Sequence, residues 1–447
     1  MPADTGARRR GWLAAARVYR DRRMLAILLM GFASGLPLLL TLSTLSYWLA
    51  SIGVDKTAIG LFALVGLPYS VKFLWAPVLD HVPVPVLGRL LGRRRAWALV
   101  VQAALIASIL ALGTWDPAAA PLATAAVAFA IAFFSASQDI VIDAYRIEIL
   151  AEDEQGAGAA ATQTGYRFGL LASGAGALAL ADFVSWPVVF AALAGLVLVG
   201  TVAVLIAPTP AAVSMPAAPA GAARLRLAVV APLADLLSRP AWLAILAFVL
   251  LYKFGDAIGG VMANPFYIEI GFTGVEIASV TKVFGMVATL AGVGAGGVLV
   301  ARHGLLPALL VGGVLQAATN LLFAAQAALG HDIAFLALTI GADNFTGGLG
   351  SAAFVAYLSS LCNPAFTGTQ YALLTSFMAA GRTVLSSGSG WLADQMDWVA
   401  FFVLTTGLAV PGLLLLLWLM RAGAGRLSPE SAGSGGLSSR PCSARRP

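Results

Sequence analysis

Charge is scarce in this sequence. Asp, Glu, Lys and Arg make up 11% of its 447 residues, whereas soluble domains carry about 25%. Hydrophobic residues make up 60% of the chain, and long apolar runs recur from Met24 to Met420. This composition excludes an ordinary soluble domain and predicts a polytopic membrane protein embedded in a lipid bilayer.

Cysteine and histidine are also scarce. Cys362 is placed at a helix end and Cys442 in the C-terminal tail, so we expect no disulfide framework. His81, His303 and His331 are scattered at the ends of apolar runs, without the spacing of metal ligands. The sequence contains no P-loop, no zinc motif and no nucleophile elbow. We therefore expect no metal site, no cofactor and no enzymatic activity.

Twelve stretches are long and apolar enough to cross a bilayer as helices. We place these helices at 24–51, 57–80, 96–114, 121–149, 158–182, 187–207, 241–268, 275–300, 305–329, 332–361, 366–393 and 398–420. The predicted fold class is therefore an all-α membrane protein with twelve transmembrane helices.

Six helices, a linker and six further helices indicate two pseudo-symmetric six-helix bundles. The fifth helix contains Arg167 and the eleventh contains Arg382, and a Gly-, Ala- or Ser-rich run follows each. Such parallel repeats are the plan of the major facilitator superfamily. The domains that we expect are a basic cytoplasmic tail (1–23), an N-terminal bundle (24–207), a cytoplasmic linker (208–239), a C-terminal bundle (240–421) and a disordered cytoplasmic tail (422–447).

Basic residues are distributed unevenly among the predicted loops. Arginines cluster in the N-terminal tail, the loop between the second and third helices, the central linker and the C-terminal tail. The loops of opposite parity contain a single basic residue, Lys56. The positive-inside rule therefore predicts that both termini lie in the cytoplasm. A net charge of +6 could indicate a nucleic-acid partner, but the clustering of the arginines in loops of one parity argues against one.

Ten ionisable residues fall inside the predicted spans. An Asp or Arg near the centre of a spanning helix costs about 2.5–3.5 kcal/mol, so these groups must pair or face a water-filled cavity. Six bases against four acids would suit an anionic ligand. The ten residues are Lys72, Asp139, Asp143, Arg146, Arg167, Lys253, Asp256, Lys282, Asp343 and Arg382.

The fourth predicted helix has the densest group of these charges. Asp139, Asp143 and Arg146 follow one another at i, i+4 and i+7, so they share one helix face, and Gln138 lies beside them. A buried carboxyl next to a base can take up and release protons. We predict that these three ionisable residues form the proton-coupling site.

Several other intramembrane features have two interpretations. Lys72, Arg167, Lys282 and Asp343 could bind substrate or could simply join helices, and both interpretations stay open. Asn344, beside Asp343, could bind substrate or a neighbouring helix. Small residues such as Gly31 and Gly35 favour close helix packing over a ligand site.

Two stretches resemble a known family. Residues 31–80 read GFASGLPLLLTLSTLSYWLASIGVDKTAIGLFALVGLPYSVKFLWAPVLD, LGRRR follows at 91–95, and residues 135–150 read SASQDIVIDAYRIEIL. Together they resemble the AmpG-type muropeptide permeases, a family within the major facilitator superfamily. The resemblance covers about residues 24–190 and continues more faintly through the C-terminal half. Some members have two further helices, for which this chain has no room.

The resemblance implies import of N-acetylglucosaminyl-anhydro-N-acetylmuramyl peptides across the bacterial inner membrane. The proton gradient would drive the import, no cofactor would be needed, and the imported fragments would enter cell-wall recycling. The helix-4 motif of the family falls on Gln138, Asp139, Asp143 and Arg146, and its helix-7 motif on Tyr252, Lys253, Gly255 and Asp256. Its cytoplasmic gating motif falls on Asp80, Gly92, Arg93, Arg94 and Arg95, with a longer loop between the two parts than in most transporters.

We therefore expect a monomeric, proton-coupled importer of a small anionic glycopeptide. Bases would neutralise the substrate carboxylates, amides would bind hydroxyls, and Trp75 and Tyr145 would contact sugar rings. The expected substrate-binding residues are Lys72, Trp75, Gln138, Tyr145, Arg167, Tyr252, Lys253, Asp256, Asp343, Asn344 and Arg382.

Three alternatives remain at this stage. A related transporter could carry another anion such as acyl-CoA, which would demand a denser basic pocket. A drug exporter would need fewer buried bases. A membrane-embedded enzyme or receptor is the third possibility, although no nucleophile–base pair or metal cluster supports an enzyme.

Overall fold

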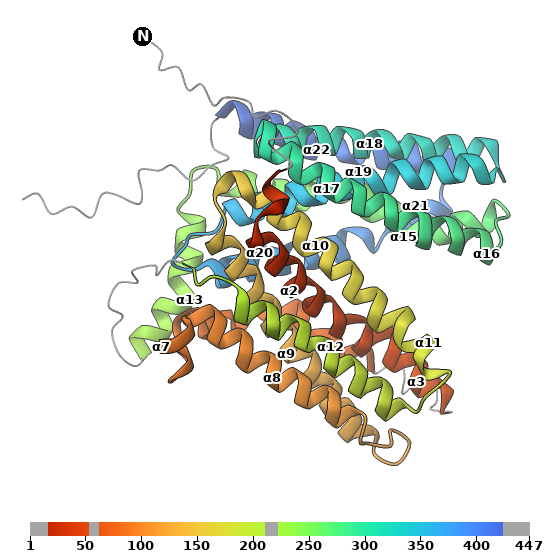
Figure 1. Ribbon diagram of the computed structural model, residues 1–447. Helices are drawn as coiled ribbons and strands as arrows, with labels where there is room; N and C mark the ends of the chain where they lie inside the picture. The colour runs from red at the N-terminus through yellow and green to blue at the C-terminus, as the bar shows by residue number, and fades with distance from the viewer. Residues whose placement is uncertain (1–16, 53–61, 211–221, 423–447) are drawn as a thin grey trace, which may run out of the picture.

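The computed structural model describes residues 17–52, 62–210 and 222–422, and within these ranges the chain forms helices and turns. Figure 1 shows two groups of helices, one from each half of the chain. The halves meet at one end, which carries α7 (Leu87–Leu91) and α13 (Ala222–Leu237), and splay apart toward α3 (Leu45–Ser51) and α16 (Gly274–Ile277). We call these the linker end and the open end.

The N-terminal half is built from long helices with short irregular breaks. In chain order after the 3₁₀ turn η1 (Arg17–Arg20) they are α2 (Arg22–Leu39), the π-helical turn η2 (Leu40–Thr44), α3, the 3₁₀ turn η3 (Phe62–Gly66), α5 (Leu67–Val71), the 3₁₀ turn η4 (Lys72–Leu74), α6 (Ala76–His81), α7, α8 (Arg93–Leu112), α9 (Pro121–Ile149), the 3₁₀ turn η5 (Glu152–Glu154), α10 (Gln155–Leu171), the π-helical turn η6 (Ala172–Gly176), α11 (Ala177–Ala181) and α12 (Trp186–Ile206).

The C-terminal half repeats this plan. After α13 it comprises α14 (Trp242–Leu251), α15 (Phe254–Glu269), α16, the π-helical turn η7 (Ala278–Phe284), α17 (Gly285–His303), α18 (Leu305–Leu329), α19 (Ile333–Ser360), α20 (Thr367–Ser386), α21 (Ser389–Asp394) and α22 (Trp398–Ala422). Each half has its own apolar core, with rings such as Phe190 in the first and Phe248 and Phe402 in the second fully buried.

Helical segments occupy the predicted spans within the described residues. Eight helical stretches in this part of the chain are each long and apolar enough to cross a membrane. The second predicted span is instead divided into short pieces, because Pro68 and Pro77 each remove a backbone donor. Its start, 53–61, lies outside the described residues, as do most of the predicted tails, 1–16 and 423–447.

Glycines allow α2 and α10 to pack in close contact. A Cβ atom at Gly31 would lie 2.4 Å from the carbonyl oxygen of Thr162, and one at Gly165 would lie 1.9 Å from that of Leu28. Gly35 faces the backbone of Tyr166 in the same way. Helix packing is therefore the role of these small residues.

The predicted linker contains a helix that sequence reasoning did not predict. Asp235 in α13 accepts hydrogen bonds from Gln370 (2.7 Å), Arg239 (2.8 Å) and Asn363 (2.9 Å). Burial would raise the pKa of Asp235, but these donors outweigh burial and hold the pKa below its usual value. The linker helix thus contacts the turn between α19 and α20 through Asn363 and the first turn of α20 through Gln370. Residues 211–221 lie outside the described part.

Replacing Asp235 by alanine is expected to loosen α13. The variant leaves Gln370 and Asn363 without their carboxylate acceptor, at a cost of about 1–3 kcal/mol. We expect faster trypsin cleavage in the linker and a lower thermal unfolding midpoint in detergent. Asp116→Ala is the control, because the Asp116 carboxylate accepts from Ala118 within its own exposed loop. Equal cleavage rates for the two variants would contradict this role of Asp235.

Candidate functional site

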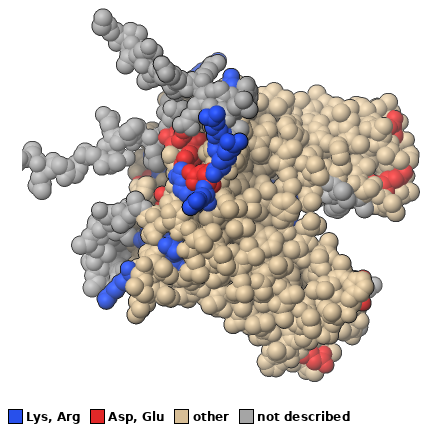
Figure 2. Space-filling view, viewed as in Figure 1, with Lys and Arg blue, Asp and Glu red and all other residues tan. Residues whose placement is uncertain are grey.

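A cavity of about 880 Å³ lies between the two halves. Its walls come from α10 of the N-terminal half and from α14, α15 and α17–α20 of the C-terminal half. The volume falls in the range of known small-molecule sites. Figure 2 shows the molecule hollowed between its two arms at the open end, while the basic side chains visible in this view gather at the linker end.

Six of the predicted substrate-binding residues line this cavity. Arg167 reaches it from α10, and the other five belong to the C-terminal half. The amino-acid sequence separates Arg167 from Arg382 by 215 positions, and the packing of the two bundles brings these residues together. The five are Lys253, Asp256, Asp343, Asn344 and Arg382.

A break in the seventh predicted span positions the ion pair between Lys253 and Asp256. The backbone leaves helical geometry at Lys253, between α14 and α15, and the helix resumes at Phe254. The Lys253 ammonium lies 3.5 Å from the Asp256 carboxylate. Broken helices commonly place polar groups at the midplane site of a transporter.

A glutamine connects this pair to the acid of α19. Lys253 donates to the Gln316 Oε1 atom at 3.2 Å, and Gln316 Nε2 donates to Asp343 at 3.4 Å. Thr319 also donates to Asp343, at 3.2 Å. Sequence reasoning missed Gln316 and Thr319, although two polar residues inside the apolar run of α18 were a usable signal.

Asn344 is held by its neighbours in the C-terminal half. Its Oδ1 atom accepts from Thr289 of α17 at 2.9 Å, and its Nδ2 atom donates to the carbonyl of Ile340 at 3.0 Å. The side chain therefore lines the cavity while it joins α17 to α19. The side chain of Lys282, also considered from the sequence, lies outside the described part of the chain.

The other five predicted substrate residues do not line this cavity. Gln138 is fully buried and donates to the carbonyl of Ala33. Tyr145 donates to Pro208 at 2.7 Å beside α12. Tyr252 donates to Leu309 at 2.8 Å and stacks on Phe354, and Trp75 donates to Ser137 at 2.9 Å and contacts the Phe133 ring. Lys72 lies in η4, where it acts electrostatically on Asp139.

Asp139 forms a polar site within the N-terminal half. Its carboxylate accepts a hydrogen bond from Ser34 of α2, and Lys72 supplies the nearby positive charge. Asp143 on the same helix lies 3.5 Å from Arg146. The two acids of α9 therefore have different partners: a hydroxyl and a lysine for Asp139, and an arginine for Asp143.

Arg146 joins the two halves through contacts with α19 and α20. Its side chain is fully buried, and it donates to Ser359 of α19 at 3.1 Å. The guanidinium also lies 5.5 Å from the ring centroid of Tyr371 in α20. Because Ser359 and Tyr371 belong to the other half, these contacts must break if the linker end is to open.

The predicted gating residues form a buried charge network at the linker end. Arg94 lies 2.7 Å from Asp80 and 2.5 Å from Glu148, and all three side chains are nearly inaccessible. The short helix α7 fills the longer loop between the two parts of the motif, so the contact between Asp80 and an arginine is present. Sequence reasoning missed Glu148, which follows the helix-4 motif directly.

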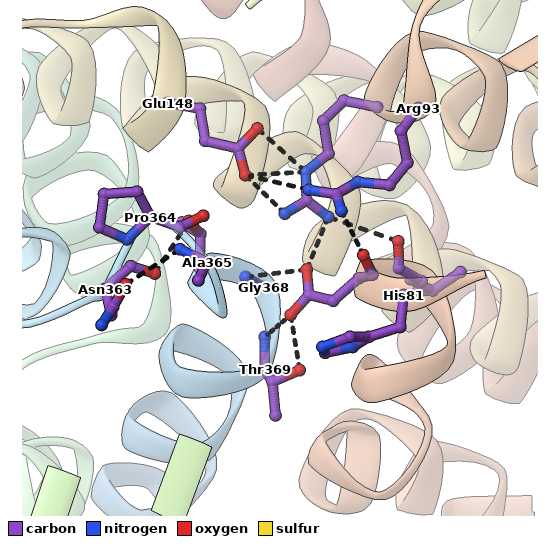
Figure 3. Close-up of polar contacts among 12 residues, drawn as sticks. His81, Arg93, Glu148, Asn363, Pro364, Ala365, Gly368 and Thr369 are labelled. Carbon is purple, nitrogen blue, oxygen red and sulfur yellow. Dashed lines mark hydrogen bonds and ion pairs between the residues drawn. The ribbon is translucent and has the colours of Figure 1, made fainter. Parts of the chain in front are cut away.

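Asp80 also holds the first turn of α20. Gly368 and Thr369 donate their backbone N–H groups to its carboxylate, at 3.3 and 2.6 Å, and the Thr369 hydroxyl adds a bond of 2.6 Å. Figure 3 shows these donors from α20 and the Glu148 carboxylate around the same network. Free N–H groups at a helix N-terminus favour a negative partner. Asp80 therefore ties the N-terminal half to the C-terminal half.

The neighbouring members of the motif have supporting positions. Gly92 has a φ of +80° where it begins α8, a conformation that favours glycine. Arg93 donates to the backbone carbonyl of Asp80. Arg95 donates to the carbonyls of Val204 (2.8 Å) and Leu205 (2.6 Å) at the end of α12.

Comparisons with known proteins agree with this architecture. The chain is 40% identical over 405 residues to the anhydromuropeptide permease of Escherichia coli K12, covering 90% of this chain and 80% of that protein. It is 33% identical to the putative transporter AmpG 4 of Rickettsia felis, covering 90% and 98%. A family model described as acetyl-coenzyme A transporter 1 matches residues 23–116.

Two solved transporters show the same fold at low sequence identity. The proton:xylose symporter XylE, of the major facilitator superfamily, aligns with a TM-score of 0.62 at 14% identity, covering 90% of this chain and 95% of that structure. The fucose:proton symporter FucP of E. coli aligns with a TM-score of 0.63 at 14% identity, covering 92% and 99%. The two bundles described above therefore form the major facilitator fold.

Proposed function

The chain belongs to the AmpG-type muropeptide permease family, and from this membership we propose that it imports anhydro-muropeptides by proton symport. It is a multi-pass membrane transporter and not an enzyme. The bacterial inner membrane is the location that we propose, with cell-wall recycling as the purpose of the import. The observation that carries the proposal is 40% identity to an anhydromuropeptide permease over 90% of the chain.

The cavity supports this substrate chemically. Peptide carboxylates are anionic, and Arg167, Lys253 and Arg382 are the basic residues among the lining side chains. Asn344 and Gln316 offer amide groups to hydroxyls and peptide bonds. Polar and charged side chains alternate with apolar ones in the lining, which suits a ligand that has both hydroxyls and apolar sugar faces.

The orientation follows from the distribution of basic residues. Among the described residues, Arg22 and Arg23 at the start of α2, Arg94 and Arg95 at the start of α8, and Arg239 after α13 lie at the linker end, so we propose that the linker end faces the cytoplasm. In that orientation the described conformation is closed on the cytoplasmic side by the contacts of Asp80, which Arg94 neutralises, and of Arg146 with the C-terminal half. The cavity then opens toward the periplasm, as an importer requires before it binds its substrate.

Uptake into membrane vesicles tests the function directly. Vesicles that contain this protein are expected to accumulate labelled anhydro-muropeptide when an inward proton gradient is imposed, and an uncoupler is expected to abolish accumulation. In this proposal the proton gradient alone drives the import, and no cofactor is needed. Uptake that is insensitive to the uncoupler would contradict proton coupling, and no uptake at all would contradict the substrate.

Acyl-CoA is a second candidate because the acetyl-coenzyme A transporter model matches residues 23–116. Its phosphates would call for more basic residues than the three in the lining. Competition decides between the two: excess acetyl-CoA is expected to leave uptake of labelled anhydro-muropeptide unchanged. Strong inhibition would favour the acyl-CoA function.

Replacing Lys253 by methionine is expected to weaken binding of anionic fragments about tenfold or more. The change leaves Asp256 without its basic partner, beside Asp343, so the wall of the cavity becomes negative. Calorimetry on purified protein measures the affinity. The control is Thr383→Ala, an uncharged change in the same lining. A lower yield of folded protein with unchanged affinity would show that Lys253 has a structural role only.

A further inference from the structure

The segment that precedes the first spanning helix reaches across to the other half of the molecule. Residues 17–20 form η1, just before α2, and the Tyr19 hydroxyl donates to the backbone carbonyl of Gly294 in α17 at 3.1 Å. These two residues are 275 positions apart in the sequence. In Figure 1 the red N-terminal segment lies where the two groups of helices meet. Neither the gating motif nor the helix-4 motif includes this contact.

A glycine in α17 makes room for the tyrosine. A Cβ atom at Gly297 would lie 2.0 Å from the Tyr19 hydroxyl oxygen, so any side chain there would displace the ring. The ring itself packs against Ala160 of α10, Val293 of α17 and Ala352 of α19. Tyr19 therefore occupies the seam in which α10 of the N-terminal half packs against α17 and α19 of the C-terminal half.

The base of η1 is fixed to the N-terminal half. Asp21 caps α2 by accepting a hydrogen bond from the backbone N–H of Arg23 at 2.8 Å. The Arg23 guanidinium donates to Glu154 at 2.8 Å and to the carbonyl of Ile149 at 2.9 Å, both in the same half. The segment thus has a base held by one half and a tip, Tyr19, that contacts the other.

The contact of Tyr19 is weak enough to open repeatedly. Burial raises the pKa of Tyr19, so its hydroxyl is a neutral donor at neutral pH. A neutral hydrogen bond whose donor can return to water favours the bonded state by only about twofold to tenfold. A contact of that size biases a conformational equilibrium without trapping the protein in one state.

We propose that residues 17–20 act as a latch on the cytoplasmic side and that Tyr19 is a gating residue of the transport cycle. The inference rests on the proposed function and its orientation, which it deepens. While the Tyr19 ring lies in the seam, its contacts with α17 and α19 oppose separation of the halves at the linker end. The ring must withdraw from α17 when that end opens. The latch acts between α10 and α17, whereas Asp80 acts on α20.

Labelling of one cysteine in the cavity tests the proposal without any substrate. The reporter is Thr383→Cys in the lining, with Cys362 and Cys442 replaced by serine. A membrane-impermeant maleimide is added to right-side-out and to inside-out vesicles, and the two labelling rates are compared. Tyr19→Phe removes only the hydroxyl and is expected to raise the ratio of the cytoplasmic to the periplasmic rate about fivefold. Tyr19→Ala also removes the ring packing and should raise the ratio about tenfold or more.

Tyr47→Phe and Tyr47→Ala are the matched controls. Tyr47 is half exposed near the open end and contacts Trp186 of its own half. Both changes should leave the ratio of labelling rates unaltered. A ratio that stays constant or falls in both Tyr19 variants would overturn the latch. Because labelling needs no substrate, failure of muropeptide uptake would overturn the proposed function and leave this result standing.

Discussion

Replacing Arg94 by alanine is expected to destabilise the closed linker end by about 3–5 kcal/mol and to reduce uptake severely. The reason is that Asp80 and Glu148 would remain buried without the guanidinium that neutralises both. Removing one partner of a buried ion pair carries a cost of this size, since it leaves an uncompensated charge. The two halves should then separate more readily at that end.

Cross-linking across the linker end measures this effect independently of uptake. The rings of His81 and Phe366, one from each half, have centroids 5.9 Å apart. A short cross-linker between cysteines at these two positions, with Cys362 and Cys442 replaced by serine, should react efficiently in the parent protein. The yield should fall strongly when Arg94→Ala is added.

Arg95→Ala is the matched control for this experiment. The Arg95 guanidinium donates to the carbonyls of Val204 and Leu205, both in its own half. Its removal is expected to leave the cross-linking yield nearly unchanged. If Arg94→Ala cross-links as efficiently as Arg95→Ala, then the buried network does not hold the linker end closed.

Replacing Asp139 by asparagine is expected to abolish proton-driven accumulation of substrate. An amide retains the shape of the carboxylate but cannot gain or lose a proton at neutral pH. Ser34 donates to the Asp139 carboxylate and Lys72 interacts electrostatically with it, so a permanently neutral side chain would remove the change of charge on which we propose that coupling depends. Exchange of labelled for unlabelled substrate at equal concentrations should continue, because exchange needs no net proton transfer.

The variant Asp143→Asn tests which of the two acids of α9 carries the proton. Arg146 keeps its hydrogen bond to Ser359 in this variant, so the contact between the halves should survive the loss of the ion pair. Accumulation that fails in Asp139→Asn and persists in Asp143→Asn would assign the proton to Asp139. Accumulation at the wild-type level in both variants would remove the proposed proton site from α9.

The positions of the spanning helices could be predicted from the sequence because lipid imposes a simple rule. A helix that crosses the bilayer must satisfy its backbone internally and present about 20 apolar residues, and both features are local. The predicted spans therefore agree with the helices even where breaks interrupt them. The helix inside the linker was not predicted because Asn363 and Gln370, more than a hundred residues away in the sequence, donate the hydrogen bonds that stabilise it.

The candidate site was predicted less completely, because the sequence does not show how each helix is rotated about its own axis. Spacing along one helix shows which residues share a face, as it did for Asp139 and Asp143. It does not show toward which neighbour that face turns. Tyr145 and Tyr252, adjacent in sequence to charged residues, turn into the apolar cores of their bundles. Gln316 was not predicted as a site residue from the sequence, yet its side chain connects Lys253 to Asp343.

The sequence by itself determined that this chain crosses a membrane many times, in two related halves, with ionisable groups that lipid would not tolerate unpaired. Those properties depend on local composition and period. Only the tertiary structure decided which charges neutralise one another and which face the cavity, because that depends on how separate helices rotate and pack. Asp80 meets the N-terminus of α20 across 288 positions of sequence, and Arg167 and Arg382 enter one cavity from opposite halves, since bundle packing alone brings such distant segments together.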